Sequence, residues 1–266
     1  MWHIDIKAYD LALNNLVERN EITGDTAAKY LSCIRQIYNH IGEGVDIKTL
    51  NSFFIDKLND DRQFSQFLSA VRKYETCVLK QAGAILNGQP YMELVHHFKE
   101  ISHKKTAAGS GVTNETVFKK INAIRNEKLK LAFRLQYRSG LRVKEISELT
   151  KDDISFYNDG KIRIHVKCGK GGQARSVNVQ ADKYLYDRLK EFTGKSEGGR
   201  LFYSRSYLKQ KSAEYGFESH DLRRINAKNR LQCEMSEGKK LREAKKVIQK
   251  EFGHKAIATT EIYLKE

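Results

Sequence analysis

Residues 253–263 read Gly-His-Lys-Ala-Ile-Ala-Thr-Thr-Glu-Ile-Tyr, and the rest of the chain is organised around this stretch. Gly253 is typical of a residue that ends a helix, and the segment from Ile257 to Tyr263 is expected to form one more short helix. Tyr263 therefore stands three residues from the end of a strongly basic sequence. This position is explained if the phenol is a nucleophile, and if Arg, Lys and His side chains from earlier segments converge on the phosphate that it attacks.

The positive charge is concentrated in the second part of the chain. The 266 residues carry a formal net charge of +15, but residues 1–104 contain 12 Lys and Arg against 13 Asp and Glu. Residues 105–266 contain 36 basic residues against 20 acidic ones. This excess predicts a polyanionic partner for the second part, of which nucleic acid is the commonest. The alternative is a charge that only keeps an ordinary enzyme in solution.

The sequence argues against several other protein classes. Its four cysteines are far apart and form no C-x-x-C pair, which predicts reduced thiols rather than a zinc cluster or a disulfide framework. These cysteines are Cys33, Cys77, Cys168 and Cys233. The N-terminus lacks the pattern of a secretory signal, and no apolar run approaches the ~20 residues of a membrane span. We therefore expect a cytoplasmic, DNA-associated protein with no membrane contact, no metal and no other cofactor.

The first hundred residues predict a small helical domain. Pro90 is the single proline of the chain, which favours long uninterrupted helices. Apolar residues at helical spacing predict helices over residues 25–42, from about 47 to 58, over 62–86 and over 91–98. We expect this bundle to span residues 1–101, with a linker of small and polar residues over 102–112. A second domain is then expected over residues 113–266.

The second domain opens with a pair of helices separated by a tight break. A predicted helix over 127–138 runs into Gly140, and the next helix begins with Arg142 near its N-terminus. A guanidinium and several free backbone N–H groups would then lie together, which suits an oxyanion. Glu145 lies one turn further on and is expected to orient Arg142. Taken alone, Arg142 is better interpreted as a surface arginine in a corner between two helices.

A β-hairpin follows. Residues 161–167 alternate apolar and polar side chains, a glycine-rich turn covers 168–172, and residues 175–179 return. Lys170 lies at the tip of this hairpin, where a flexible turn can present it to a bound backbone. The alternative is an ordinary exposed turn lysine.

The last third of the chain is expected to be helical. Ser219 opens a helix in which His220 and Arg223 are three residues apart and so lie on one face. Further helices are predicted over 225–235 and 241–252. The second of these is rich in lysine, which indicates either a solvated helix face or contact with a DNA backbone.

Six of these residues resemble, in their order along the chain, the motifs of the tyrosine recombinase (phage integrase) family. They are Arg142 in SGLRVKE, Lys170 in GKGGQARSV, His220 and Arg223 in HDLR, His254 in GHKAIATT and Tyr263 in EIY. The resemblance covers essentially all of residues 113–266, and weakly the first domain. It implies a mainly α fold with a small antiparallel β-sheet, in which a helical core-binding domain precedes an α+β catalytic domain. It also implies a clamp around duplex DNA, with a dimer on each recombination site and a homo-tetramer on two sites. No further arm-binding domain is expected before residue 1.

The resemblance also implies a role for each motif residue. Arg142 and Arg223 would bind the non-bridging oxygens of a DNA phosphate bidentately, and His220 and His254 would add donors. Tyr263 would attack the phosphorus, and Lys170 would protonate the departing 5′ oxygen. The product would be a 3′-phosphotyrosine, formed without a metal because the arginines supply the positive charge.

The predicted function is that of a site-specific DNA recombinase, which integrates, excises or inverts DNA. Two alternatives stay open at this point: DNA relaxation like that of a type IB topoisomerase, and a catalytically idle DNA-binding relative. Outside the six motif residues, further DNA-binding candidates are chosen by charge. They are Arg35, Arg72, Lys73, Lys80, Arg175, Lys245 and Lys246.

Overall fold

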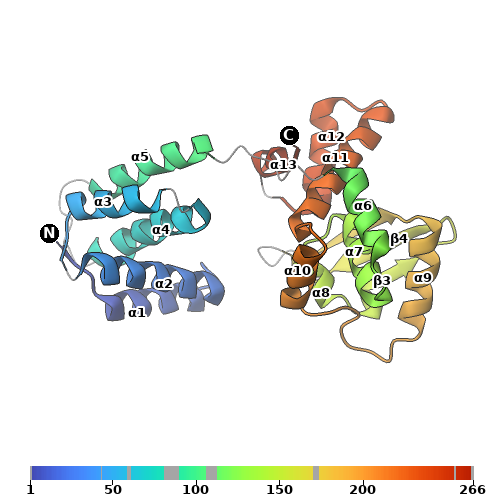
Figure 1. Cartoon of the computed structure of the whole chain (residues 1–266), viewed down its shortest axis with the longest axis horizontal. Helices are drawn as coiled ribbons and strands as arrows, with labels where there is room; N and C mark the ends of the chain where they lie inside the picture. The colour runs from blue at the N-terminus through green and yellow to red at the C-terminus, as the bar shows by residue number, and fades with distance from the viewer. Residues whose placement is uncertain are drawn as a thin grey trace. The chain divides into compact units, whose positions relative to one another are not determined.

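The computed structural model describes residues 2–42, 44–58, 61–80, 90–105, 113–169, 174–254 and 256–264. The chain divides into two compact units, Met1–Ala108 and Gly109–Glu266 (Figure 1). Each unit has an apolar core of its own. The division falls within the segment that the sequence predicts as a linker.

The first unit is a helical bundle with one short strand pair. Its elements are β1 (Trp2–His3), α1 (Ile6–Glu18), α2 (Gly24–Ile41), β2 (Gly44–Val45), α3 (Ile47–Lys57), α4 (Asp61–Tyr74), a π-helical turn (Glu75–Leu79) and α5 (Pro90–Lys105). Edge-to-face contacts among aromatic rings fill much of the core, with Phe53, Phe54 and Phe98 near its centre. No helix in the described part of the chain is long and apolar enough to cross a membrane.

In this unit, local sequence signals predict where some helices begin and end, but they predict the lengths of the helices less well. α2 ends at Gly42 and α3 begins after Asp46, whose carboxylate accepts a hydrogen bond from the Thr49 backbone N–H. The helix predicted over 91–98 continues to Lys105, because its apolar stripe extends through Ile101 to the core. Residues 102–105, predicted to belong to the linker, are therefore helical. Residues 81–89, including the predicted helix stop, lie outside the described residues.

A buried carboxyl group occupies the π-helical turn after α4. Glu75 is 2% exposed, and neither of its side-chain oxygens has a hydrogen-bond partner among the described residues. Burial raises the pKa of this carboxyl from 4.5 to about 7. The folded chain therefore favours the neutral form, whereas the unfolded chain ionises near 4.5. Stability must fall as the pH rises from about 4.5 to about 7, and the penalty persists at higher pH.

We expect Glu75→Gln to stabilise the first unit at high pH only. The difference in free energy of unfolding from the natural chain should grow from near zero at pH 4 to about 3 kcal/mol at pH 8. Urea unfolding at several pH values measures it through the fluorescence of Trp2, the single tryptophan of the chain. Glu21→Gln, at an exposed position in the turn before α2, is the control and should give no such trend. A pH-independent difference for Glu75→Gln would contradict the prediction.

The second unit packs helices around a three-stranded antiparallel sheet of order β3-β4-β5. Its elements are α6 (Asn114–Ala123), α7 (Glu127–Ser139), α8 (Val143–Glu148), a 3₁₀ turn (Lys151–Asp153), β3 (Ile154–Phe156), β4 (Lys161–Val166), β5 (Arg175–Gln180), α9 (Lys183–Gly194), α10 (Arg205–Glu214), α11 (Ser219–Ser236), α12 (Leu241–Phe252) and α13 (Ile257–Leu264). Ile164 pairs with Val177 across the predicted hairpin, and both are buried in the core that also contains α7. The mainly α fold with a small antiparallel sheet is confirmed.

The C-terminal helices differ in one respect from the expected pattern. The helices predicted to begin at Ser219 and at Ile225 form the single helix α11, because no glycine or proline interrupts the chain between them. α11, α12 and α13 lie against one another at one end of the second unit (Figure 1). This end of the unit carries most of the motif residues.

Candidate active site

Arg223 is the most deeply buried cation of the C-terminal helices. It is 1% exposed and lies on α11. Its Nη1 donates to the backbone carbonyl of Gly140, and its Nη2 donates to the carbonyl of Phe252 at 2.8 Å. These bonds join three segments that are far apart in sequence: α11, the turn after α7 and the end of α12.

Arg223 carries its charge without a direct ion pair to a carboxylate of the described residues, although the Glu145 carboxylate is near enough to favour its charged form. It forms no ion pair within the part of the chain that the structure describes, and its buried Nε has no hydrogen-bond partner. Burial, and then the charge of Arg142, lower the pKa of Arg223 to about 9, which still leaves it protonated at neutral pH. An unpaired buried cation is costly, so the site favours an anionic ligand.

His254 lies directly beside this guanidinium. It follows Gly253, which ends α12 in the left-handed conformation at a φ of 61°. The Nε2 atom of His254 is 3.1 Å from Nη2 of Arg223, and Nδ1 is 2.9 Å from Oγ1 of Thr260. Because a guanidinium only donates hydrogen bonds, Nε2 must accept. The neutral ring then carries its proton on Nδ1 and donates it to Thr260.

Thr260 is a site residue that the motif search does not reveal. It is fully buried on α13, three residues before Tyr263. Residues three apart share a helix face, so a hydroxyl at this position could have been connected with the site from spacing alone. Its contact with His254 fixes the orientation of the imidazole.

Tyr263 packs into the same cluster from α13. Its ring stacks on His254 with centroids 5.2 Å apart, and the guanidinium carbon of Arg223 lies 5.4 Å from the ring centroid. Its hydroxyl is 3.4 Å from Nδ1 of His220. Partial desolvation, and then the charges of Arg223 and Arg224, lower the pKa of His220 below its ordinary value. His220 is therefore neutral at pH 7 and can accept a proton from the phenol.

Arg142 is held at the N-terminus of α8 by Glu145. Its backbone N–H donates to Glu145 Oε2 at 2.8 Å and its Nη1 donates to Oε1 at 3.0 Å. Glu145 is therefore in direct contact with Arg142, the residue that it is expected to orient. Burial alone would raise the pKa of Glu145, but Arg175 and then Arg142 hold it below its ordinary value. The charge of Arg142 also lowers the pKa of both His220 and Arg223, so Arg142 lies within electrostatic range of the cluster.

Gly140 lets the segments of the site approach closely. Its φ of +65° is left-handed, and a Cβ built on it would lie 2.6 Å from Asn226 Oδ1 and 2.6 Å from the Phe252 ring. Asn226 in turn donates to the carbonyls of Tyr137 and Arg138, both at 2.9 Å. These hydrogen bonds thus join the end of α7 to α11 beside Gly140, where a side chain would not fit.

Gly140→Ala is expected to destabilise the second unit by more than about 2 kcal/mol, from left-handed strain together with the two clashes. Urea unfolding followed by far-UV circular dichroism measures the change. Gly194→Ala is the matched control, because Gly194 ends α9 with nothing within 4 Å of its added Cβ. Equal stability of the two variants would show that the close approach of α7 and α11 does not require a glycine at residue 140.

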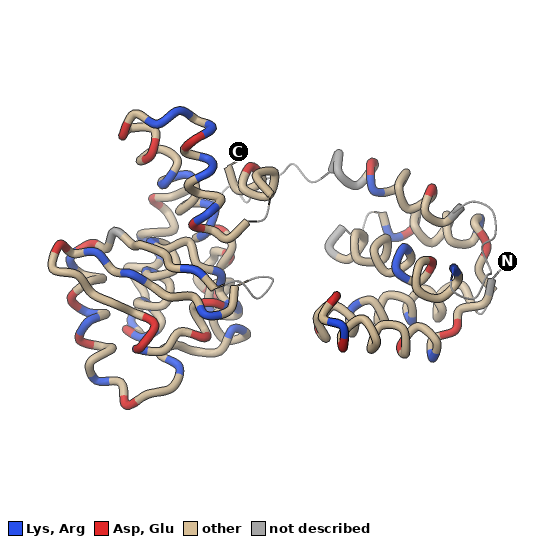
Figure 2. The backbone as a smooth tube through the Cα atoms, turned by 180° about the vertical axis from the view of Figure 1, so that it is seen from behind, with Lys and Arg blue, Asp and Glu red and all other residues tan. Residues whose placement is uncertain are grey.

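The remaining predicted residues were chosen from the sequence by motif or by charge. Lys170 lies outside the described residues. Lys245 pairs with Glu261 of α13 at 2.8 Å, and Lys246 is exposed on α12. In the first unit, Arg35, Arg72 and Lys80 are exposed and Lys73 is half-buried. Figure 2 shows basic residues spread over the helices and strands of the second unit with acidic residues among them. DNA contact by these side chains stays a prediction.

Arg175, the other predicted DNA-binding residue, lies within the site. Its guanidinium donates to both carboxylate oxygens of Glu145 at 2.9 Å, and its side chain is 12% exposed. The sequence marked Arg175 as a DNA-binding candidate from its charge alone and gave no sign of its pairing with Glu145; DNA contact by Arg175 stays a prediction.

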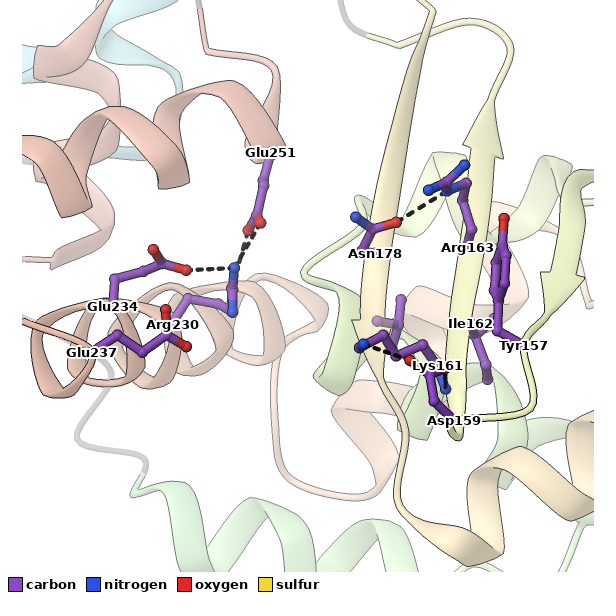
Figure 3. A pocket seen from close by; sticks show the side chains of 11 residues that line it. Tyr157, Asp159, Lys161, Ile162, Arg163, Asn178, Arg230, Glu234, Glu237 and Glu251 are labelled. Atoms are coloured by element: carbon purple, nitrogen blue, oxygen red, sulfur yellow. Dashed lines mark hydrogen bonds and ion pairs between the residues drawn. The ribbon is translucent and has the colours of Figure 1, made fainter. Parts of the chain in front are cut away.

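A separate cavity of about 560 Å³ lies between β4, β5 and the ends of α11 and α12 (Figure 3). Arg230 projects into it and bridges Glu234 and Glu251, each at 2.7 Å. Its walls therefore carry both signs of charge, already paired in part. None of the five motif residues that the structure describes lines it.

Residues 112–266 match the sequence model of the phage integrase family. Among solved structures, the chain is similar to a lambda integrase dimer bound to a COC′ core site, with 18% identity, a TM-score of 0.64 and coverage of 96% and 93% of the two chains. It is also similar to Tn1549 transposon integrase in complex with a circular intermediate DNA, with 12% identity, a TM-score of 0.67 and coverage of 97% and 95%. A lambda integrase tetramer bound to a Holliday junction matches with 17% identity, a TM-score of 0.64 and coverage of 98% and 77%. No curated protein matches the chain.

Proposed function

Because the chain belongs to the phage integrase family, the tyrosine recombinases, we propose that it is a site-specific recombinase that cleaves and rejoins duplex DNA through Tyr263. One observation carries this proposal: the Tyr263 ring, His254 and the buried Arg223, which forms no ion pair with any described residue, are in mutual contact. A nucleophile and an unpaired cation in one cluster suit attack on a phosphodiester.

In the proposed reaction, the Tyr263 oxygen forms a bond to phosphorus while the bond from phosphorus to the 5′ oxygen breaks. The phenolic proton passes to His220, whose Nδ1 lies 3.4 Å from the hydroxyl. Lys170 gives a proton to the departing 5′ oxygen. The product is a 3′-phosphotyrosine with a free 5′-hydroxyl, and the reverse reaction rejoins a strand without an external energy source.

The two motif arginines stabilise the charge that gathers on the non-bridging oxygens. Arg223 is held by two backbone carbonyls, and Arg142 by Glu145, so both donors are oriented before DNA binds. Preorganised donors of this kind supply the largest part of the rate enhancement in many enzymes. Their charge makes a metal ion unnecessary in this scheme.

We propose duplex DNA as the partner, with a dimer on each recombination site and a tetramer across two sites. Support comes from relatives of the same fold, which include a lambda integrase dimer on a core site and a tetramer on a Holliday junction. The basic excess of residues 105–266 agrees with a polyanionic partner.

Covalent trapping on DNA tests the proposed function. The full chain is incubated with a pool of nicked duplexes of randomised sequence, and covalent protein–DNA adducts are isolated and sequenced. A recombinase is expected to enrich a related set of sequences. Adducts on many unrelated sequences would indicate a topoisomerase, and no adduct at all would indicate an idle DNA-binding protein; either result overturns the proposal.

A further inference from the structure

Arg175 stands at the start of β5 and reaches two other parts of the second unit. Its Nη1 and Nη2 donate to Oε1 and Oε2 of Glu145, each at 2.9 Å, which makes a bidentate pair. Its Nε donates to the backbone carbonyl of Glu251 at 2.9 Å. All three guanidinium nitrogens are therefore used within the chain.

The contact with Glu251 fixes the end of α12. Glu251 and Phe252 have adjacent carbonyls, the first bound by Arg175 and the second by Arg223. Cations at the last carbonyls of a helix are favoured by its dipole. The Arg175 side chain also packs on the turn that follows, since a Cβ on Gly253 would lie 3.3 Å from its Cδ. The next residue is His254.

The contact with Glu145 acts on the other side of the site. Glu145 is buried, and its carboxylate is shared between Arg175 and Arg142. Because Arg175 neutralises part of the carboxylate charge, Arg142 does not have to balance it alone. The Arg142 side chain is 19% exposed. Without it, the buried carboxylate would have Arg142 as its remaining cationic partner and would hold that guanidinium more tightly.

We propose that Arg175 is a positioning residue for the cleavage reaction: it aligns Arg142 through Glu145 and fixes His254 through the end of α12. This inference rests on the proposed function and replaces the expectation that Arg175 binds the DNA backbone. An arginine is required because its planar fork serves two carboxylate oxygens while Nε reaches a third acceptor, which a lysine cannot do.

The test compares Arg175→Met, Arg175→Lys and Glu145→Gln on a duplex captured by the natural chain. Arg175→Met is expected to lower the single-turnover rate of adduct formation about 10- to 100-fold at saturating DNA, as for a small misplacement of reacting groups. Its Kd should change less than about threefold, with an unchanged salt dependence. The double variant with Glu145→Gln should be no slower than the slower single variant, because both changes break one chain of contacts.

Arg163→Met is the matched control, because Arg163 lies on β4 next to β5, is exposed and bonds Asn178. It should react like the natural chain. If Arg175→Met does not fold, Arg175→Lys carries the test: the positioning role predicts a slower rate with normal binding. A direct phosphate contact would be preserved by lysine.

Two results would overturn the positioning role. The first is that Arg175→Met raises the Kd more than about tenfold and lowers the salt slope by about one, while the rate at saturating DNA stays normal. Loss of a phosphate contact would have these effects. The other is a double variant whose rate loss is the product of the two single losses.

A readout without DNA separates this inference from the proposed function. In ¹⁵N-arginine-labelled protein, the Nε–H of Arg142 should exchange with solvent at least about tenfold more slowly in Arg175→Met than in the natural chain, because Glu145 then holds Arg142 more tightly. The exchange rate should be unchanged in Arg163→Met. If the natural chain forms no adduct, the proposed function fails while the exchange result still decides whether Arg175 orders Arg142. Equal exchange in all three proteins would overturn the inference itself.

Discussion

Tyr263→Phe is expected to abolish covalent adduct formation, with a fall in rate of more than about 10⁴-fold, as for loss of an enzyme nucleophile. Phenylalanine keeps the ring that stacks on His254 at 5.2 Å and lies near Arg223. It removes the hydroxyl, whose nearest described partner is His220 at the long distance of 3.4 Å. Folding and DNA affinity should therefore stay close to those of the natural chain, with a Kd within about threefold.

The measurement is gel separation of covalent adducts on the captured duplex, combined with an equilibrium binding assay. Tyr215→Phe is the control, because Tyr215 is a half-buried tyrosine that ends α10 and packs on the core of the same unit. It should form adducts normally. An adduct formed by Tyr263→Phe would show that another group is the nucleophile.

Arg223→Lys is expected to lower the cleavage rate about 10²- to 10³-fold at saturating DNA, as for loss of one preorganised donor. Lysine keeps the charge but concentrates its donors on one nitrogen. It cannot serve the carbonyls of Gly140 and Phe252 together and still lie beside His254. A carbonyl left without a donor in the core should also lower the free energy of unfolding, by about 1–3 kcal/mol.

Single-turnover kinetics and urea unfolding measure the two effects of Arg223→Lys. Arg224→Lys is the matched control on the same helix, because Arg224 is half-exposed and pairs with Asp221 at 3.3 Å through one contact. Its rate should stay within about twofold of the natural value. Equal rates for the two variants would remove Arg223 from the proposed mechanism.

Much of the local structure could be predicted from sequence because its causes are local. Gly42 ends α2, Thr113 caps α6 and Gly253 ends α12, each through contacts within a few residues. The alternation along β4 gave the correct buried face of the hairpin. The order of the motif residues indicated the family, which the match over residues 112–266 shows.

The contacts between distant segments could not be predicted in this way. A periodic pattern shows which face of an element is buried, but it does not identify the partner. The Arg175 side chain looked like a free surface cation because its acceptor, Glu145, lies 30 residues earlier. Likewise, the charge of Glu75 gave no sign that its carboxyl is buried, since the π-helical turn shifts the residues of that stretch away from ordinary helical spacing.

The way α13 is seated has a kinetic consequence. This eight-residue helix buries Thr260 fully, but Ile262 is 62% exposed, and Tyr263 and Leu264 are only partly buried against a small apolar cluster of α11 and α12. An element with so little buried surface detaches at a smaller cost than the strands and α7, which form the main core of the same unit. We therefore expect Tyr263, the proposed nucleophile, to visit an undocked state together with Thr260, while Arg223 keeps its bonds to the carbonyls of Gly140 and Phe252 and Arg142 keeps its bonds to Glu145. Reseating this one short helix would then set the moment at which a strand is cut.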